Sequence, residues 1–345
     1  MAVRRIDTTL YEKEKSMEKL HLTMAMGPYD RTMALRLGDV QPEGIKLNYL
    51  TLEPEEAFWR MVHYGEFHVS EMSFGTYVSR WAQGKRDLIA IPVFPSRSFR
   101  HASVYLNIES GIDTPKDLEG KRIGLPGYAH SAGIWIRGAL RDYYGVDIES
   151  IHWFQAGLEE PGREDKVQIT LPSQVSFRNV RDRVLSAMLE TGDLDAVCSA
   201  RAPSCFVRRS PKIKRLWPDY KKEEVEYYRR SRIFPIMHTV VIRRDIHEEH
   251  PWVAQSLFKA LEEAKQRCLQ QMGITAALRY SLPWLIPAVE EQEEVFGPDP
   301  FPYGLEANRF TIETFMSYLK DMYLIEKVFD PAEMFAPSTV RPSRI

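Results

Sequence analysis

The sequence has few cysteines and none of the spacings that give cysteine a common role. It contains three, Cys198, Cys205 and Cys268, and no two form a Cys-x-x-Cys pair. An odd and scattered set argues against a disulfide framework and suits a reducing compartment. Also missing are a Gly-x-Gly-x-x-Gly turn, a Walker loop and a Gly-x-Ser-x-Gly elbow. Nothing therefore favours a nucleotide-dependent enzyme or a serine hydrolase.

Neither an excess of one charge nor a long apolar run is present. Lys and Arg number 46 against 48 Asp and Glu, for a net charge of −2. Such a balance is not typical of proteins that bind nucleic acid or an anionic membrane. No segment approaches the roughly 18 uninterrupted apolar residues of a transmembrane helix. Residues 1–18 are polar and lack a signal-peptide core, so we expect a polar N-terminal extension and a cytoplasmic protein.

Hydrophobic residues, at 44% of the 345-residue chain, are plentiful enough for two cores. From residue 20 onward, short apolar stretches alternate with segments of helical spacing, which predicts an α/β fold with largely parallel sheets. The alternation restarts near residue 114. We expect two α/β lobes with a ligand cleft between them, lobe 1 from residues 19–108 plus 240–345 and lobe 2 from residues 109–239. Within lobe 2, residues 179–190 are predicted to form a helix.

Reactive side chains follow several of the predicted strands. The strand Leu20–Met26 runs into a Gly-Pro turn that presents Tyr29, Asp30 and Arg31. Loops at the carboxyl ends of strands form the ligand crevice of open α/β sheets, so this turn is a candidate site. Guanidinium groups match carboxylates bidentately, although each arginine here is as readily a structural ion-pair residue. The arginines just past predicted strand ends are Arg31, Arg97, Arg100 and Arg201.

Six short segments carry a resemblance to a known family. They are Gly27–Thr32, Val40–Ile45, Phe67–Ser73, Phe94–His101, Phe234–His238 and Pro302–Arg309. These segments resemble the 4,5-dihydroxyphthalate decarboxylase family, and the resemblance extends from about residue 19 to the C-terminus. It implies a two-lobed fold of the type II periplasmic-binding-protein kind. It also implies a carboxy-lyase that converts a dihydroxylated aromatic dicarboxylate to its monocarboxylate and CO2 without an organic cofactor.

Such a reaction needs an acid over the carboxyl-bearing ring carbon, a base for the para hydroxyl, and cations for the second carboxylate. His101 and His238 are the expected proton-transfer residues, because imidazole titrates near neutral pH and both match the family segments. Asp30 and Glu71 are expected to deprotonate a hydroxyl or to orient a histidine, and Asp30 is also a candidate helix cap. The expected substrate-binding residues are Tyr29, Arg31, Ser73, Arg97, Arg100, His130, Ser131, Arg201 and Phe234.

Three alternatives remain open. The set Asp30, Glu71, His101 and His238 would suit a divalent metal, yet no metal-ligand spacing is present and we expect no metal. A non-catalytic binding protein for an aromatic or anionic solute would share the same fold, since fold alone does not define function. An enzyme of pyrimidine or cofactor biosynthesis is the third. We expect a small aromatic carboxylate as partner, with no nucleic acid and no membrane, and a homo-oligomer remains open.

Overall fold

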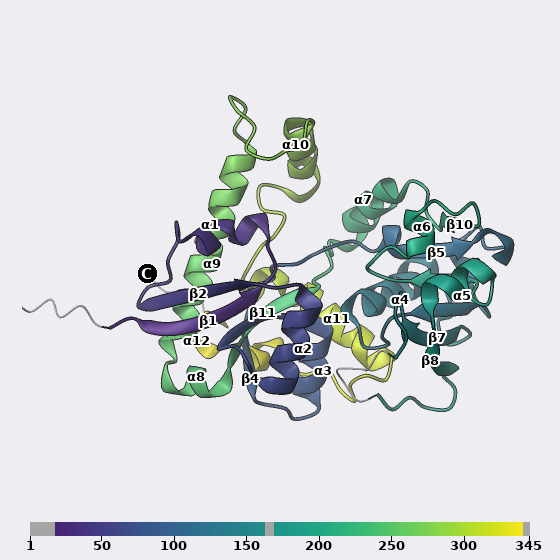
Figure 1. The fold of residues 1–345 in the computed structure, drawn as a ribbon, viewed down its shortest axis with the longest axis horizontal. Coiled ribbons are helices and arrows are strands. Elements are labelled where there is room, and N and C mark those ends of the chain that lie inside the picture. Colours follow the sequence, from purple (N-terminus) through teal and green to yellow (C-terminus); the bar gives the residue numbers. More distant parts are fainter. Residues whose placement is uncertain (1–17, 163–168, 341–345) are drawn as a thin grey trace, which may run out of the picture.

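The computed structural model describes residues 18–162 and 169–340, which form two lobes, each built around its own sheet (Figure 1). Apart from Glu18, the predicted N-terminal extension lies outside the described residues. The chain passes from the first lobe to the second and then returns to the first. Each lobe combines one sheet with helices and is an α/β unit. In the part of the chain that the structure describes, no helix combines the length and apolar character needed to cross a membrane.

The first sheet has five strands in the order β2-β1-β3-β11-β4. β1 (Leu20–Met26) lies parallel to β2 (Ile45–Thr51) and β3 (Val69–Ser73). β11 (His238–Arg243) runs antiparallel to β3 and to β4 (Leu88–Ile91). Almost every side chain of β3 and β11 is buried, as expected for central strands covered on both faces. A strand from late in the chain is thereby inserted beside β3.

The second sheet has six strands in the order β10-β5-β9-β6-β7-β8, with parallel pairing among β9, β6, β7 and β8. β5 and β10 are antiparallel additions at one edge. The bounds are β5 (Val104–Asn107), β6 (Arg122–Leu125), β7 (His152–Gly157), β8 (Phe177–Val184), β9 (Ala196–Cys198) and β10 (Ile213–Arg215).

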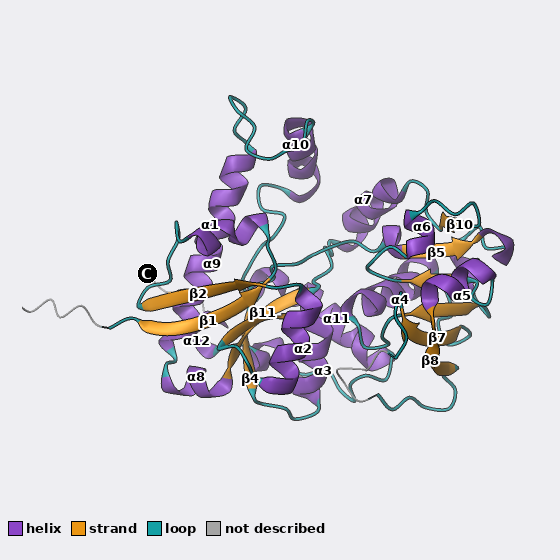
Figure 2. Ribbon diagram, in the orientation of Figure 1, coloured by secondary structure: helices purple, strands orange, loops and turns teal. Residues whose placement is uncertain are grey.

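Helices cover both sheets, and one of them joins the lobes (Figure 2). On α11, the ring of Phe315 lies 5.3 Å from Phe74 of the first lobe and 5.0 Å from Trp135 of the second. The helix bounds are α1 (Met33–Leu37), α2 (Pro54–Tyr64), α3 (Phe74–Ala82), α4 (Ser131–Tyr144), α5 (Leu185–Thr191), α6 (Ser204–Val207), α7 (Tyr220–Ser231), α8 (Arg244–Glu249), α9 (Trp252–Met272), α10 (Leu285–Phe296), α11 (Arg309–Asp321) and α12 (Pro337–Val340).

Two expectations about lobe 2 differ from the structure. The helix predicted over residues 179–190 is wrong in its first half, where β8 continues to Val184 before α5 begins. Most of β8 is an exposed polar edge strand, so it shows no apolar alternation. The sequence also predicts that lobe 1 extends to residue 108. In the structure β5, which ends at Asn107, instead pairs with β9 and β10 of the second sheet. Antiparallel insertion of a strand into a distant sheet leaves no local sequence signal.

The two connections between the lobes run side by side. Residues 92–103 lead out of the first lobe and residues 232–237 lead back. Ser98 N donates to Pro235 O at 3.1 Å, and an isolated antiparallel bridge joins Arg97 to Ile236. Paired connections of this kind permit one lobe to rotate against the other while holding both near the cleft.

Candidate active site

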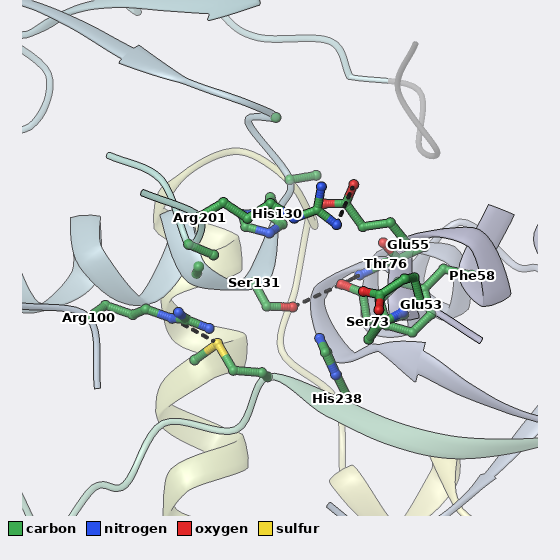
Figure 3. Close-up of a pocket in the computed structure, with 16 residues that line it drawn as sticks. Glu53, Glu55, Phe58, Ser73, Thr76, Arg100, His130, Ser131, Arg201 and His238 are labelled. Carbon is green, nitrogen blue, oxygen red and sulfur yellow. Dashed lines mark hydrogen bonds and ion pairs between the residues drawn. The ribbon is translucent and has the colours of Figure 1, made fainter. Parts of the chain in front are cut away.

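A cavity of about 290 Å³ lies between the lobes (Figure 3). The first lobe contributes the starts of α2 and α3 and the start of β11. The second lobe contributes the turn before α4 and the loop after β9, and Arg100 enters from the outgoing connection. The side chains and turns that line it are Glu53, Pro54, Glu55, Phe58, Ser73, Thr76, Arg100, Gly127, Ala129, His130, Ser131, Ala132, Ala200, Arg201, Met237 and His238.

A hydrogen-bonded triad lies at the first-lobe side of this cavity. The fully buried carboxylate of Glu71 lies with Oε1 at 2.5 Å from Nδ1 of His238. The same oxygen accepts a hydrogen bond from the Tyr29 hydroxyl at 2.6 Å, and Oε2 accepts one from the Gly27 amide at 3.0 Å. The three side chains therefore form one buried network that reaches the cavity through His238.

The register of the first sheet explains why Glu71 and His238 are in contact. In the antiparallel pair of β3 and β11, Ser73 faces His238 and Glu71 faces Val240. Glu71 and His238 are thus diagonal neighbours on one face, a separation that long polar side chains can bridge. The Gly-Pro turn after β1 supplies Tyr29 and the Gly27 amide from the neighbouring parallel strand.

The network determines the charge of Glu71. Burial by itself raises the pKa of this carboxyl group, but attraction to His238 and hydrogen bonds from His238, Tyr29 and Gly27 leave the pKa below its ordinary value. Conversely, burial and the Glu71 charge raise the pKa of Tyr29, which stays a neutral donor. An ionised Glu71 requires that Nδ1 of His238 carry the hydrogen.

His238 presents its other nitrogen to the cavity. Its side chain is 19% exposed, and the edge of the ring packs against Phe58 with centroids 4.9 Å apart. Among the described residues, none makes a hydrogen bond to Nε2. In Figure 3 the ring projects from β11 toward the space beside Ser73 and Ser131. Nε2 is therefore available to a ligand, with Nδ1 anchored behind it.

The lobes touch at the floor of the cavity. Ser73 Oγ and Ser131 Oγ lie 2.9 Å apart, and the Gly75 amide donates to Ser131 Oγ at 2.9 Å. Ser73 also caps α3 by accepting from the Thr76 amide. A Cβ at Gly75 would lie 2.9 Å from the Ala129 carbonyl oxygen, so only glycine permits this approach. The N-termini of α3 and α4 consequently meet at the cavity, where their dipoles favour an anion.

Two of the expected arginines reach the cavity. The side chain of Arg100 points into it from the outgoing connection, with Nε at 3.3 Å from the sulfur of Met237. Burial lowers the pKa of Arg100 to about 10, so the guanidinium stays charged at neutral pH. Arg201 lies across the opening, with its guanidinium 3.8 Å from Glu55 of α2. Both ends of that pair are well exposed, so its energetic contribution is small.

The other two arginines lie elsewhere. Arg97 is buried and donates to the carbonyls of Phe234 and Pro302 at 2.9 and 3.1 Å and to the amide oxygen of Asn308. Burial lowers its pKa to about 10. Arg31 donates to the carbonyl of Pro95 at 2.5 Å and pairs with Asp30. Both guanidinium groups tie chain segments together.

Asp30, Phe234 and His101 are also displaced from the cavity. Asp30 accepts from the Arg31 amide at 2.7 Å at the start of a short 3-10 turn. The Phe234 ring packs on Phe99 at a centroid distance of 4.7 Å. His101 lines a separate cavity of about 20 Å³, and burial lowers its pKa to about 4. The structure therefore does not bring His101 and Asp30 together with Glu71 and His238.

That separation bears on the metal alternative. In the described parts of the chain, no three His, Cys, Asp or Glu side chains gather as a metal site would require. Glu71 and His238 are neighbours, while Asp30 and His101 lie apart from both. The four residues proposed from the sequence do not form one ligand set.

Two proteins of known activity are similar to this chain over most of their own length. The 4,5-dihydroxyphthalate decarboxylase of Comamonas testosteroni is 38% identical over 330 residues, which cover 95% of this chain and all of that protein. The enzyme of the same name from Pseudomonas putida is 39% identical over 214 residues, which cover 62% of this chain and 83% of that protein. The chain belongs to the 4,5-dihydroxyphthalate decarboxylase family. No family model matches the chain.

Solved structures show the same fold at low identity. The aliphatic sulphonate-binding protein SsuA of Escherichia coli matches with a TM-score of 0.54 at 13% identity, covering 93% of this chain and 98% of that protein. The CA3427 gene product of Candida albicans, described as having the generic periplasmic-binding-protein fold, matches with a TM-score of 0.51 at 12% identity, covering 93% and 96%. The predictions of the family, of a two-lobed periplasmic-binding-protein-like fold and of a carboxy-lyase are confirmed.

Four residues that line the cavity are not among those expected from the sequence. Phe58 has the helical spacing of a core residue, yet its ring lies at the cavity against His238. Glu53 and Glu55 begin α2, a position in which acidic residues are common for helix stability alone. Met237 directly precedes His238. The signal available for all four is their nearness to a predicted strand end or helix start, which is too common to single them out.

Proposed function

We propose that this protein removes one carboxylate of 4,5-dihydroxyphthalate, or a close analogue, to give protocatechuate and CO2. The observation that carries the proposal is the Glu71–His238 pair, which presents one imidazole nitrogen to an interlobe cavity in a chain of this family. A proton donor at that place is what protonation of a ring carbon requires.

The charges around the cavity match the two ends of such a substrate. The guanidinium of Arg100 and the N-terminus of α4 favour carboxylates on one side. Glu53 and Glu55 of α2 lie on the other side and can accept hydrogen bonds from ring hydroxyls. Phe58 lies on the same side as the two glutamates and packs against His238. We place the carboxylates toward Arg100 and the hydroxyls toward α2.

Proton transfer then follows from this placement. Loss of the para hydroxyl proton to a carboxylate of α2 moves electron density to the ring carbon that bears the leaving carboxylate. His238 in its protonated form donates the Nε2 proton to that carbon. The bond to the carboxylate breaks, its electron pair restores the aromatic ring, and CO2 leaves. The α2 carboxylate returns its proton to the phenolate oxygen, which restores the hydroxyl, and His238 takes the one proton that the reaction consumes from solvent.

The supporting residues make the transition state easier to reach. Ionised Glu71 accepts a hydrogen bond from Nδ1 of His238 and fixes the orientation of the ring, while Tyr29 and Gly27 hold Glu71. Arg100 binds the carboxylate that stays, whereas the leaving carboxylate lies near Phe58 and His238 and loses its water. The proposal uses only groups of the chain, with no organic cofactor and no metal.

The test is an assay of the purified protein with 4,5-dihydroxyphthalate, following CO2 and protocatechuate with and without a chelator. We expect product in both samples. His238→Gln should lower kcat by about 10²- to 10⁴-fold, the usual contribution of a general acid. His152→Gln, which changes an exposed histidine of β7, is the matched control and should keep full activity.

Each of the other outcomes would contradict one part of the proposed function. Tight binding of substrate without product would favour a solute-binding protein, and neither binding nor product would mean a different ligand. Product that disappears with the chelator would show that the reaction depends on a metal. A loss of only a few-fold in His238→Gln would remove this residue from proton transfer.

A further inference from the structure

The guanidinium of Arg100 is held beside the interlobe cavity by a sulfur atom. Its Nε donates to Sδ of Met237 at 3.3 Å, the contact drawn as a dashed line between these two side chains in Figure 3. Within residues 18–162 and 169–340, the Arg100 side chain makes no other hydrogen bond and no salt bridge. A thioether is a weak and uncharged acceptor. The terminal nitrogens of Arg100 therefore remain available to a ligand in the cavity.

Arg97, three residues earlier on the same connection, has the opposite arrangement. Its terminal nitrogens donate to the carbonyls of Phe234 and Pro302 at 2.9 and 3.1 Å and to the amide oxygen of Asn308. These oxygen acceptors occupy Arg97, which does not line the cavity. In Arg100 the sulfur contacts Nε alone, so it fixes one edge of the guanidinium and leaves the other edge for the cavity.

Met237 is itself fixed where the chain crosses between the lobes. Its amide donates to the Ser96 carbonyl of the outgoing connection at 2.9 Å, and its carbonyl accepts from the Phe74 amide at the start of α3 at 2.9 Å. The residue is 1% exposed and lines the cavity. His238 follows it directly in the chain. The sulfur thus links the cation of the cavity to the strand that carries the imidazole.

We propose that Met237 is a positioning residue for Arg100, and that its sulfur aims the guanidinium at a ligand carboxylate without neutralising its charge. This inference rests on the proposed function in one respect, the placement of a substrate carboxylate at Arg100. A carboxylate in place of the sulfur would pair with the guanidinium and weaken its attraction for a substrate anion. An apolar group in the same place would leave Nε without an acceptor and the guanidinium without a fixed direction.

The experiment measures binding of phthalate, which has both carboxylates but no ring hydroxyl and so cannot follow the proposed reaction. In calorimetric titration, Met237→Leu should raise the dissociation constant about fivefold, the size of one net hydrogen bond. Leucine has nearly the volume of methionine but no acceptor. Met188→Leu, at a buried position of α5 outside the cavity, is the matched control and should bind phthalate as the unchanged protein does.

Two polar substitutions of Met237 distinguish the acceptor from its lack of charge. Met237→Gln keeps an uncharged acceptor near Nε, and its phthalate affinity should stay within about twofold of the unchanged protein. Met237→Glu has the same shape but adds a carboxylate, and its affinity should be at least about tenfold lower than that of the Gln variant. A role in packing alone would not separate Gln from Glu or restore binding in the Gln variant.

Urea denaturation gives a second control, which needs no ligand. Met237→Leu and Met188→Leu should lose similar, small amounts of stability, because both replace a buried methionine by a residue of nearly equal volume. A much larger loss in Met237→Leu, together with weak binding in Met237→Gln, would show that Met237 acts through packing and would overturn the inference.

Failure of this inference differs from failure of the proposed function. Equal phthalate affinity in Met237→Leu and the unchanged protein, equal affinity in the Gln and Glu variants, or no phthalate binding by the unchanged protein would overturn the role of Met237 even if 4,5-dihydroxyphthalate is decarboxylated. Weaker binding in Met237→Leu that is restored in Met237→Gln would support this role even if no product forms.

Discussion

At the scale of single residues, the site depends on one carboxylate that is made to stay ionised inside the protein. Glu71 is fully buried, and an isolated carboxylate there would take up a proton. His238, Tyr29 and the Gly27 amide reverse this preference by hydrogen bonding to its two oxygens. The imidazole gains a fixed orientation in return. Glu71 touches His238 rather than the cavity, so it is a positioning residue.

Replacing Glu71 by Gln tests this role. We expect kcat to fall by about 10²-fold or more, because His238 loses the carboxylate that fixes its ring and tautomer. KM should change by only a few-fold, since Glu71 does not line the cavity, and steady-state kinetics measures kcat and KM separately. Glu109→Gln, at an exposed position, is the control. A rise in KM as large as the fall in kcat would indicate a structural role only.

At the scale of elements, α3 and α4 bring two helix N-termini to one point. The approach is possible because Gly75 has no side chain where the second lobe's Ala129 carbonyl lies. The bond between Ser73 and Ser131 then joins the capping residue of one helix to the first residue of the other. A ligand carboxylate in the cavity benefits from both dipoles only while this contact holds.

Gly75→Ala should therefore separate the two helix starts. We expect KM for 4,5-dihydroxyphthalate to rise at least about tenfold, since a misplacement of the order of 1 Å can cost that much or more. Gly133→Ala on α4 is the matched control, because its added Cβ would meet no atom closer than 3.8 Å. Steady-state kinetics on both variants decides the matter. Equal KM values would contradict the role given to this contact.

At the scale of the whole molecule, Arg97 ties together three segments that are far apart in sequence. Arg97 lies on the outgoing connection. Its guanidinium donates to the carbonyl of Phe234 on the returning connection, and to the carbonyl of Pro302 and the amide oxygen of Asn308 near α11. The sequence predicts a carboxylate clamp, and the structure instead shows a buried cation whose two terminal nitrogens donate to carbonyl and amide oxygens. Arg97 therefore holds the two connections and the segment before α11 together.

Arg97→Met should consequently affect stability more than catalysis. Removing a charged donor that serves several buried acceptors should lower the free energy of unfolding by about 3 kcal/mol or more. Urea denaturation measures this loss, and kcat at a temperature where the variant is folded should change by only a few-fold. Arg267→Met, at an exposed ion pair on α9, should leave stability nearly unchanged. A large loss of kcat in a stable Arg97 variant would restore the clamp interpretation.

The sequence by itself determined the fold class of the protein and many of its strands and helices. Alternating apolar segments predicted two α/β lobes, and short motifs indicated the family. Local patterns also placed Glu71 on a strand and Ser131 at a helix start, because strand and helix periodicity and end signals are short-range properties. These local patterns do not reveal the polar edge strand β8, because its exposed side chains show no periodic alternation of apolar residues.

Tertiary structure decided which reactive residues meet. Glu71 and His238 are 167 residues apart, and they become neighbours only because β11 returns antiparallel to β3 in one particular register. A shift of one residue would turn the His238 side chain to the opposite face of the sheet. The packing of the outgoing connection likewise leaves Arg100 in the cavity, while His101 and Arg97 lie outside it. Register and chain crossing depend on contacts between distant segments, and so the sequence supplied candidates while the packing selected among them.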